Sequence, residues 1–313
     1  MNIALPAHKF SDPSLTAKGE TRAHVDFIGL ETLWINTGTL CNIECKNCYI
    51  HSSPTEDRLA YITLTEVEIY LDEIAREGFG AREIGLTGGE PFMNPDILGM
   101  SEAALIRGHD ILILTNAMQP MMRPRIRVGL LNLKSRFGSH LKLRVSLDHH
   151  SEALHDAERG SGSFAKTMEG LGWLSTNGFA LAIAGRTAPG ESEADERAGY
   201  AALFAQNRLP LDALNSSDLV IFPEMDESAD VPEITTACWG ILHVDPASMM
   251  CATSRMVVKR KGDDHPVVVA CTLLPDDASF EMGSTLKDAM GAVKLNHRHC
   301  ARFCVLGGAS CSA

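Results

Sequence analysis

The segment CNIECKNCYI, residues 41–50, carries three cysteines, Cys41, Cys45 and Cys48, in a Cys-x3-Cys-x2-Cys spacing. Metal sites that a protein closes by itself usually have four ligands, and no fourth cysteine lies nearby in the sequence. Cysteine thiolates hold cubane iron–sulfur clusters, one thiolate per iron. Three thiolates therefore leave one iron with an open coordination position. The alternative is a zinc site that His51 completes.

The composition is that of an ordinary globular protein. Of the 313 residues, 45% are hydrophobic and 22% are charged, which is enough for one large α/β domain with an appendage or for two modest domains. A formal net charge of −12 argues against a protein that grips a phosphate backbone. No apolar run is long enough to span a bilayer, and the first 20 residues lack the apolar core of a secretory signal. We expect a cytoplasmic protein with neither nucleic-acid nor membrane partners.

The cysteines are unevenly distributed. Nine cysteines in a chain without a secretory signal favour metal or redox use over disulfides. Three lie in the front segment, and the others fall in the last quarter of the chain, at Cys238, Cys251, Cys271, Cys300, Cys304 and Cys311. Two cysteine-rich regions around a cysteine-free body indicate two separate metal sites and a domain boundary near 220–235.

Strand and helix signals alternate through the body of the chain. Strands are predicted at 33–39, 82–88, 110–115, 141–147, 179–185 and 218–222, and helices at 65–78, 96–107, 124–137, 163–177 and 193–206. The first helix has a capping box at Thr65 and Glu68 and can end at Gly78. The alternation predicts repeated β/α units with a parallel sheet, either open and doubly wound or curved into an incomplete barrel.

Polar loops follow the first four predicted strands. They are the cysteine segment, TGGEP (87–91), TNAM (115–118) and SLDHH (146–150). In both architectures the ligand site lies beyond the carboxyl ends of the strands. We therefore expect these four loops to meet at one rim.

The Cys-x3-Cys-x2-Cys segment, followed by Gly-Gly-Glu-Pro after the next strand, resembles the radical S-adenosylmethionine (SAM) superfamily over about residues 33–223. The resemblance implies an α/β fold with a partial (β/α)6 TIM-like barrel. It also implies a [4Fe-4S] cluster whose open iron is chelated by the amino and carboxylate groups of SAM. One-electron cleavage of SAM then gives a 5′-deoxyadenosyl radical, which abstracts a hydrogen atom from the substrate.

The resemblance assigns roles to individual residues. The cluster ligands would be Cys41, Cys45 and Cys48. Gly88, Gly89 and Glu90 match the loop that receives the SAM amine, because glycines let backbone carbonyls approach and Glu90 can offset the ammonium charge. Softer matches are Asn116 as a polar group facing SAM, Ser146 and Arg159 as partners of the SAM carboxylate, and Asp148 as a partner of the ribose or the substrate.

One position departs from the family pattern. The residue before the third cysteine is usually aromatic and packs near the adenine, but here it is Asn47, and the aromatic residue follows as Tyr49. Plain structural roles also stay open for the softer matches. The glycines can form a tight turn, Asn116 can be a turn residue, Ser146 and Asp148 can cap the next element, and Arg159 can form a surface salt bridge.

The C-terminal cysteines suggest a second site. CWGILHVDPASMMC (238–251) is expected to form a hairpin with a cysteine at each end, and the region resembles the auxiliary-cluster extensions called twitch and SPASM domains. That resemblance implies one or two auxiliary iron–sulfur clusters. We favour one four-cysteine cluster from Cys238, Cys251, Cys304 and Cys311, with Cys300 nearly as good and Cys271 as a buried apolar residue. A zinc knuckle is the alternative.

These patterns predict three parts, an N-terminal extension (1–32), a radical SAM barrel (33–230) and an auxiliary-cluster domain (231–313). Peptide-modifying members often carry an N-terminal recognition domain of about 80 residues, and the short segment before the first strand is too small for one. We therefore expect a small-molecule substrate, or a peptide delivered without that domain. A flavodoxin or ferredoxin-type reductant could dock at the basic segment RMVVKRKG (255–262), which can equally be a solvated hairpin edge.

The sequence identifies no catalytic acid or base. His149, His150, Arg186, Glu224 and Asp226 follow predicted strands and should face the barrel mouth, where each can also be an ordinary loop residue. A different class of function is a non-catalytic iron–sulfur electron carrier or cluster-delivery protein, but a carrier has no use for a SAM-binding loop. A zinc-dependent binding module is a third possibility.

Overall fold

The computed structural model describes residues 8–223 and 230–308, and its centre is one curved, nine-stranded sheet. The strand order is β10-β9-β8-β2-β3-β4-β5-β6-β7. Six consecutive parallel strands form the barrel wall: β2 (Thr32–Asn36), β3 (Glu83–Thr87), β4 (Asp110–Thr115), β5 (Leu141–Ser146), β6 (Ala180–Arg186) and β7 (Leu219–Phe222). β7 and β10 are edge strands, so the barrel is partial, as the sequence predicts.

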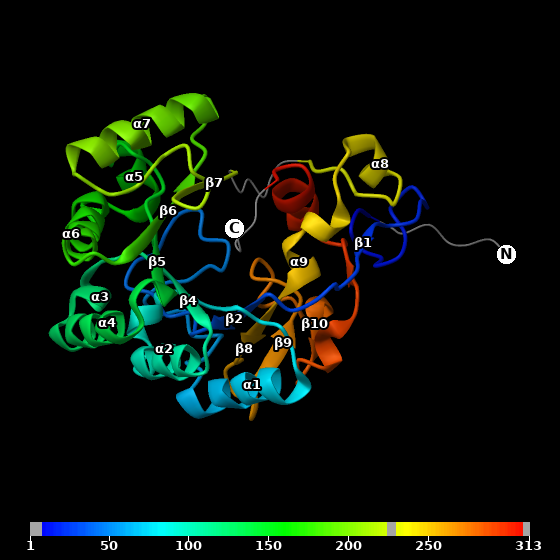
Figure 1. The fold of residues 1–313 in the computed structure, drawn as a ribbon. Helices are drawn as coiled ribbons and strands as arrows, with labels where there is room; N and C mark the ends of the chain where they lie inside the picture. Colours follow the sequence, from blue (N-terminus) through cyan, green and yellow to red (C-terminus); the bar gives the residue numbers. More distant parts are fainter. Residues whose placement is uncertain (1–7, 224–229, 309–313) are drawn as a thin grey trace.

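Helices cover the outer side of this wall (Figure 1). The expected helices are α1 (Leu64–Glu77), α2 (Ile97–Ile106), α4 (Pro124–Phe137), α6 (Ser163–Thr176) and α7 (Glu193–Gln206), and the structure adds the short α3 (Gln119–Met122) and α5 (Glu152–Arg159). The start of α1 differs from the prediction, because the capping box is formed by Thr63 and Glu66. Gly78 ends α1 in the left-handed conformation, as expected. No helix in the described ranges is long and apolar enough to cross a membrane.

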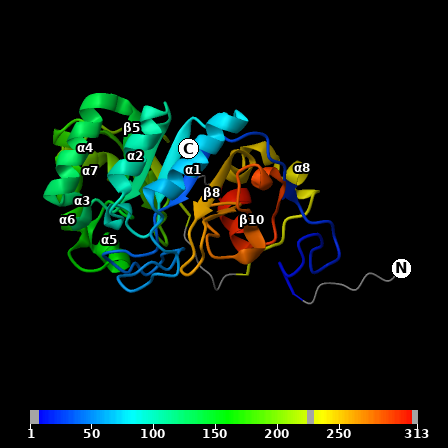
Figure 2. The ribbon, with the colours of Figure 1, turned by 90° about the horizontal axis from the view of Figure 1, so that it is seen from below.

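The C-terminal extension continues the sheet on the open side of the barrel (Figures 1 and 2). β8 (Ser254–Val258) pairs in parallel with β2, and β9 (Val267–Val269) and β10 (Glu281–Gly283) follow antiparallel. The predicted hairpin at 238–251 is wrong. That stretch forms two short helices, α8 (Cys238–Leu242) and α9 (Met250–Thr253), because His243 ends α8 in a left-handed conformation and Asp245 caps a 3-10 turn.

The N-terminal segment packs against this extension. β1 (His24–Val25) pairs antiparallel with β11 (Val293–Lys294). The buried Arg22 forms an ion pair of 2.6 Å with Glu233 and also donates to the carbonyl of Leu295. One apolar core joins residues of the N-terminal segment, the barrel strand β2 and the extension. The three-part division predicted from the sequence remains a proposal, and the two outer parts are joined by these contacts.

The basic side chains of the segment 255–262 form contacts within the chain. Arg255 is buried and donates hydrogen bonds to the carbonyls of Cys251, Ala289 and Gly291. The next three basic residues form ion pairs, Lys259 with Glu66, Arg260 with Glu281 and Lys261 with Asp57. These charges are used to attach the hairpin β8–β9 to the rest of the chain.

The barrel interior depends on a close approach between β2 and β3. A Cβ atom on Gly85 would lie 2.3 Å from the ring of Trp34, which is fully buried. We predict that Gly85→Ala lowers the free energy of unfolding by about 1–3 kcal/mol, because the indole has no room to move. Anaerobic urea-induced unfolding, followed by circular dichroism, measures this change.

Gly172→Ala is the matched control. Gly172 lies in α6, and a Cβ atom there meets nothing within 4 Å. The substitution should raise the free energy of unfolding by about 0.5–1 kcal/mol through helix propensity. Equal effects of the two substitutions would contradict the packing described for β2 and β3.

Candidate active site

One cavity at the carboxyl ends of the barrel strands gathers most of the predicted site residues. Its volume is about 110 Å³. It is lined by Cys41, Cys45, Cys48, Tyr49, Gly88, Gly89, Asn116, Ser146, Asp148 and Arg159. The four polar loops therefore meet at one rim, as expected from the parallel topology. Glu90 is the one predicted cofactor-binding residue that does not line this cavity.

The glycine loop is held directly against the backbone that leads into the cysteine segment. The Gly89 N–H donates to the Gly38 carbonyl at 2.8 Å, and the Glu90 N–H donates to the Leu40 carbonyl at 3.1 Å. A Cβ atom on Gly88 would lie 2.5 Å from the Gly38 oxygen, and one on Gly89 would lie 2.3 Å from the Leu40 oxygen. Gly88 also has a φ of +141°. Glycine is therefore required at both positions for the two loops to pack.

Glu90 has a different position from the one expected for an amine ligand. Its carboxylate is buried and accepts hydrogen bonds from the Thr115 hydroxyl and the Asn116 N–H, both at 2.9 Å, and from the Phe92 N–H at 3.2 Å. Burial raises the pKa of Glu90 to about 7, although these hydrogen bonds act in the opposite direction. Glu90 ties the glycine loop to the end of β4.

Asn116 faces the cysteine segment. Its Nδ2 donates to Asn42 Oδ1 at 2.9 Å and lies 3.9 Å from the Cys41 sulfur. Its backbone N–H is held by Glu90, and its carbonyl accepts a hydrogen bond from the Thr167 hydroxyl at 3.1 Å. This side chain therefore belongs to the cavity wall and has a fixed orientation.

Asp148 and Arg159 form a buried bidentate ion pair. Arg159 Nε lies 2.8 Å from Asp148 Oδ2, and Arg159 Nη2 lies 3.0 Å from Asp148 Oδ1. The two side chains are only 9% and 12% exposed, so a surface salt bridge is the wrong interpretation of Arg159. Burial alone would raise the pKa of Asp148, but the charge and hydrogen bonds of Arg159 hold it below its ordinary value.

The three front cysteines line one cavity, and in the part of the chain that the structure describes they do not form a group placed for a single metal ion. Burial raises the pKa of Cys41 to about 12 and also raises the pKa of Cys45, so these two thiols are neutral without a metal. The backbone N–H of Ser52 donates to the Cys48 sulfur at 3.4 Å. His51 is exposed and does not line the cavity. The predicted zinc alternative with His51 as the fourth ligand has no support in this arrangement.

Asn47 and Tyr49 have separate roles. Asn47 Nδ2 donates to Glu158 Oε2 at 2.6 Å, which attaches the cysteine segment to the end of α5. Tyr49 lines the cavity described above and also a neighbouring one. Both residues therefore line the cavity, and the hydrogen bond of Asn47 also holds the loop in place.

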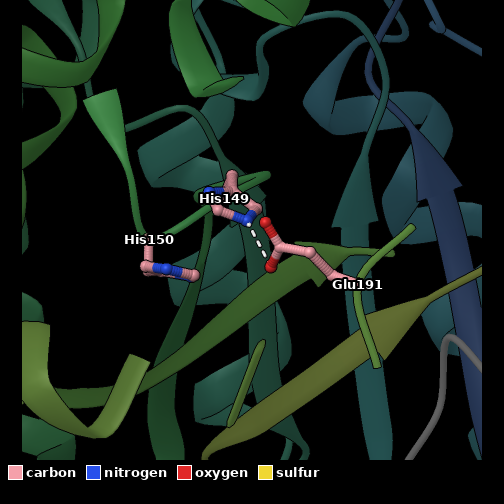
Figure 3. Close-up of side chains that lie close together, drawn as sticks. All are labelled: His149, His150 and Glu191. Atoms are coloured by element: carbon pink, nitrogen blue, oxygen red, sulfur yellow. Dashed lines mark hydrogen bonds and ion pairs between the residues drawn. The ribbon is translucent and has the colours of Figure 1, made fainter. Parts of the chain in front are cut away.

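His149, His150 and Glu191 form a second polar cluster, shown in Figure 3. In the described part of the chain they are the one group of three or more histidines, cysteines or carboxylates placed for a single metal ion, with ligand atoms within 4.8 Å of one another. The Ser151 N–H donates to His149 Nδ1 at 2.9 Å, so the neutral ring carries its proton on Nε2 and donates it to Glu191 Oε2 at 3.2 Å. A metal ion at Nε2 would displace the Nε2 proton. A neutral imidazole would then carry its proton on Nδ1, and Nδ1 could no longer accept the hydrogen bond from the Ser151 N–H. The cluster joins the loop after β5 to the loop after β6 through the hydrogen bond between His149 and Glu191.

The C-terminal cysteines line a second, mainly apolar cavity. The four that line it are Cys251, Cys271, Cys300 and Cys304. Cys238 lies outside it, and its sulfur accepts a hydrogen bond from the Thr235 N–H at 3.3 Å. Cys311 lies outside the described residues. The cysteines that line this cavity therefore differ from the four favoured from the sequence, since Cys271 and Cys300 are among them. The reason is that the segment after β9 and a π-helical turn at Cys300–Val305 both line this cavity.

The neighbouring cavity contains residues that the sequence did not identify. It lies between the barrel and the extension and is lined by Tyr49, Leu114, Arg144, Ser146, Asp148, Arg159, Ala184, Gly185, Arg186, Phe222, Leu273 and Phe303. Leu273 and Phe303 come from the extension, and no pattern in the sequence marks them. Of the residues expected at the barrel mouth, Arg186 lines this cavity, and Glu224 and Asp226 lie outside the described residues.

Comparisons with known proteins agree with this arrangement. The model of the Radical SAM superfamily matches residues 35–198. The Bacillus subtilis antilisterial bacteriocin subtilosin biosynthesis protein AlbA is 29% identical over 145 residues, which is 46% of this chain and 30% of AlbA. The mycofactocin maturase MftC of Mycobacterium ulcerans is 28% identical over 140 residues, which is 45% of this chain and 35% of MftC. The chain spans about a third of the length of these curated relatives.

Solved structures share the fold. Streptococcus suis SuiB bound to S-adenosylmethionine superposes with a TM-score of 0.60 at 12% identity, covering 84% of this chain and 65% of SuiB. The anSMEcpe structure with bound AdoMet gives a TM-score of 0.59 at 13% identity, covering 83% of this chain and 77% of that one. Since the family model covers more than half of the sequence and the partial barrel agrees with it, this chain belongs to the radical SAM superfamily and is an enzyme with a cysteine-rich C-terminal extension.

Proposed function

We propose that this enzyme binds a [4Fe-4S] cluster through Cys41, Cys45 and Cys48, binds SAM beside it, and abstracts a hydrogen atom from a peptide substrate. The observation that supports this most is the shared cavity, where the three cysteines meet the glycine loop and Arg159. Together the cluster and SAM would supply a 5′-deoxyadenosyl radical. The three-thiolate set fits such a cluster because the remaining lining contains, among the described residues, no fourth cysteine and no histidine, which leaves one iron free for a further ligand.

The chain's own residues would hold SAM in the following way. The backbone of Gly88 and Gly89 would receive its amine, and Asn116, fixed by Glu90, would present a polar side chain. Ser146 and the part of the Arg159 guanidinium that Asp148 does not occupy would bind the carboxylate. Because both oxygens of Asp148 contact Arg159, we assign Asp148 the task of orienting that guanidinium rather than binding ribose. Tyr49 would contact the adenosyl part.

We assign an auxiliary iron–sulfur cluster to Cys251, Cys271, Cys300 and Cys304. All four line one cavity, and burial raises the pKa of Cys251 to about 11 and that of Cys300 as well. Iron loading would therefore release protons from these thiols. In the described residues these four do not form a single-ion group, which favours a larger cluster over a zinc knuckle.

A peptide is the favoured substrate class. Relatives include a bacteriocin biosynthesis protein and a maturase, and SuiB has been solved bound to its precursor peptide SuiA. The neighbouring cavity between barrel and extension is the place where such a substrate would meet SAM. A small-molecule substrate is the second candidate. A flavodoxin or ferredoxin-type protein would supply electrons.

The front cluster is tested by Cys45→Ala. We predict that this variant no longer releases 5′-deoxyadenosine after anaerobic reconstitution and reduction, because one iron loses its thiolate, while the C-terminal iron stays in place. Chromatography of the nucleoside and iron analysis measure the two effects. Lys46→Ala is the matched control, since the Lys46 side chain is 72% exposed and does not line the cavity, and this variant should cleave SAM normally. Normal cleavage by Cys45→Ala would refute the assignment.

The auxiliary site is tested in a chain whose three front cysteines are replaced by alanine. In that background we predict that Cys271→Ala loses most of the remaining reconstituted iron, because one cluster ligand is removed. Cys238→Ala should keep it, since Cys238 lies outside the cavity. Iron and sulfide analysis with Mössbauer spectroscopy checks both variants. The reverse result would restore the ligand set predicted from the sequence.

The buried ion pair is tested by Asp148→Asn. Removing one partner leaves Arg159 buried without its counter-charge, so the free energy of unfolding should fall by about 3–5 kcal/mol. Glu193, which is 67% exposed and pairs with Arg197 along α7, provides the control, and Glu193→Gln should change stability by less than about 0.5 kcal/mol. Urea-induced unfolding measures both. If the double variant Asp148→Asn/Arg159→Gln is no more stable than Asp148→Asn, the two side chains do not act as a pair.

A further inference from the structure

The cavity between the barrel and the extension contains a cationic group that no described carboxylate neutralises by contact. Arg186 ends β6 and lines both this cavity and the cavity of the three front cysteines, in which we place SAM and which we call the SAM cavity. Its Nε and Nη1 atoms are buried and have no hydrogen-bond partner among the described residues. Buried donors without acceptors are costly to a folded protein, and a charged donor more so. This cost suggests that the group is kept for a ligand.

Arg159 provides the contrast within the same cavity. Arg159 lines the same two cavities as Arg186, but its Nε and Nη2 donate hydrogen bonds to the two oxygens of Asp148. Arg186 has no ion pair with any carboxylate in the described ranges. The positive charge of Arg186 helps to lower the pKa of Asp148, so the two groups are near one another. Both oxygens of Asp148, however, accept hydrogen bonds from Arg159. No described residue therefore supplies an acceptor for Arg186 Nε and Nη1, and a ligand in the cavity can supply one.

The other residues that line the cavity indicate which chemical groups the ligand carries beside its hydrogen-bond acceptor. The rings of Phe222, at the end of β7, and Phe303, in the extension, are stacked with centroids 5.4 Å apart. Both line this cavity, together with Leu273 and Tyr49. Ala184 precedes Arg186 by two residues on the same face of β6 and lines the same cavity with a small side chain.

We propose that Arg186 binds a carboxylate of the substrate, with an aromatic or apolar group of the same substrate resting beside Phe222 and Phe303. The planar guanidinium matches the two oxygens of a carboxylate. Arg144 lines the same cavity from β5 and adds positive charge. A singly charged carboxylate suits the site better than a doubly charged phosphate, because the Asp148 carboxylate lies nearby and would repel the second charge. This proposal rests on the proposed function only in placing the substrate next to SAM.

Arg186 is assigned to the substrate rather than to SAM because of its neighbours. Arg186 and the two phenylalanines share one cavity, and neither Phe222 nor Phe303 lines the SAM cavity. The carboxylate of SAM already has a donor in Arg159. The substrate carboxylate can come from a peptide C-terminus or from an acidic side chain, and the experiment distinguishes these two sources.

The test measures binding to the reconstituted enzyme saturated with SAM, by anaerobic equilibrium dialysis. The probes are N-acetylphenylalanine, its neutral amide N-acetylphenylalaninamide, and N-acetyl-aspartyl-phenylalaninamide, which carries the carboxylate on a side chain. We expect at least one acidic probe to bind about tenfold more tightly than the neutral amide, as a charge-assisted hydrogen bond allows. In Arg186→Gln this preference should fall to about twofold or less. Arg186→Lys should keep part of it.

Arg125→Gln is the matched control, because Arg125 is exposed on α4 and lines neither cavity. It should leave the preference unchanged. SAM affinity is measured separately for each variant, as is 5′-deoxyadenosine release without a substrate. Arg186→Gln should bind SAM within about threefold of the parent protein. A tenfold loss of SAM affinity in Arg186→Gln would place Arg186 in the SAM site and overturn the proposal.

The absence of any preference for the acidic probes in the parent protein would overturn it as well. Failure of the proposed function has a different signature, since the parent protein would then neither bind SAM nor release 5′-deoxyadenosine. The affinity ranking of the two acidic probes identifies the source of the carboxylate.

Discussion

The backbone contact between the glycine loop and the segment that enters the cysteine loop is the constraint on which the site depends. Two hydrogen bonds, from Gly89 to Gly38 and from Glu90 to Leu40, join the ends of β2 and β3 where no side chain fits between them. Glu90 then carries the connection to the end of β4. The loop that holds the cysteines and the wall that faces them are thus one rigid unit.

Charge is distributed around this unit in two different ways. Asp148 and Arg159 neutralise one another in a buried pair, which holds a guanidinium in the wall of the cavity. Arg186, a short distance along the next strand, has no such partner in the described chain. The extension closes the open side of the barrel and supplies Leu273 and Phe303 to the space beside Arg186. The sheet continues from β2 into β8, so the position of these residues is fixed by strand pairing.

Much of the barrel could be predicted because its signals are local. Alternating apolar strands and capped helices give the bounds of β4, α4 and α7 as observed, and parallel strands place their polar loops at one rim. The C-terminal part was less predictable. The stretch 238–251 forms short helices instead of a hairpin. Cys271 and Cys300 line the same cavity because segments that are distant in the sequence contact one another. The orientation of Glu90 also follows from tertiary hydrogen bonds, which its place in a motif does not reveal.

The central claim is that one iron of the front cluster lacks a protein ligand and is chelated by the amine and carboxylate of SAM. Electron–nuclear double resonance of the reduced enzyme, with SAM labelled by 15N in the amine and 17O in the carboxylate, tests it most directly. The account predicts strong hyperfine coupling from both labels. Their absence, together with coupling from a histidine nitrogen of the protein, would show a fourth protein ligand and contradict it.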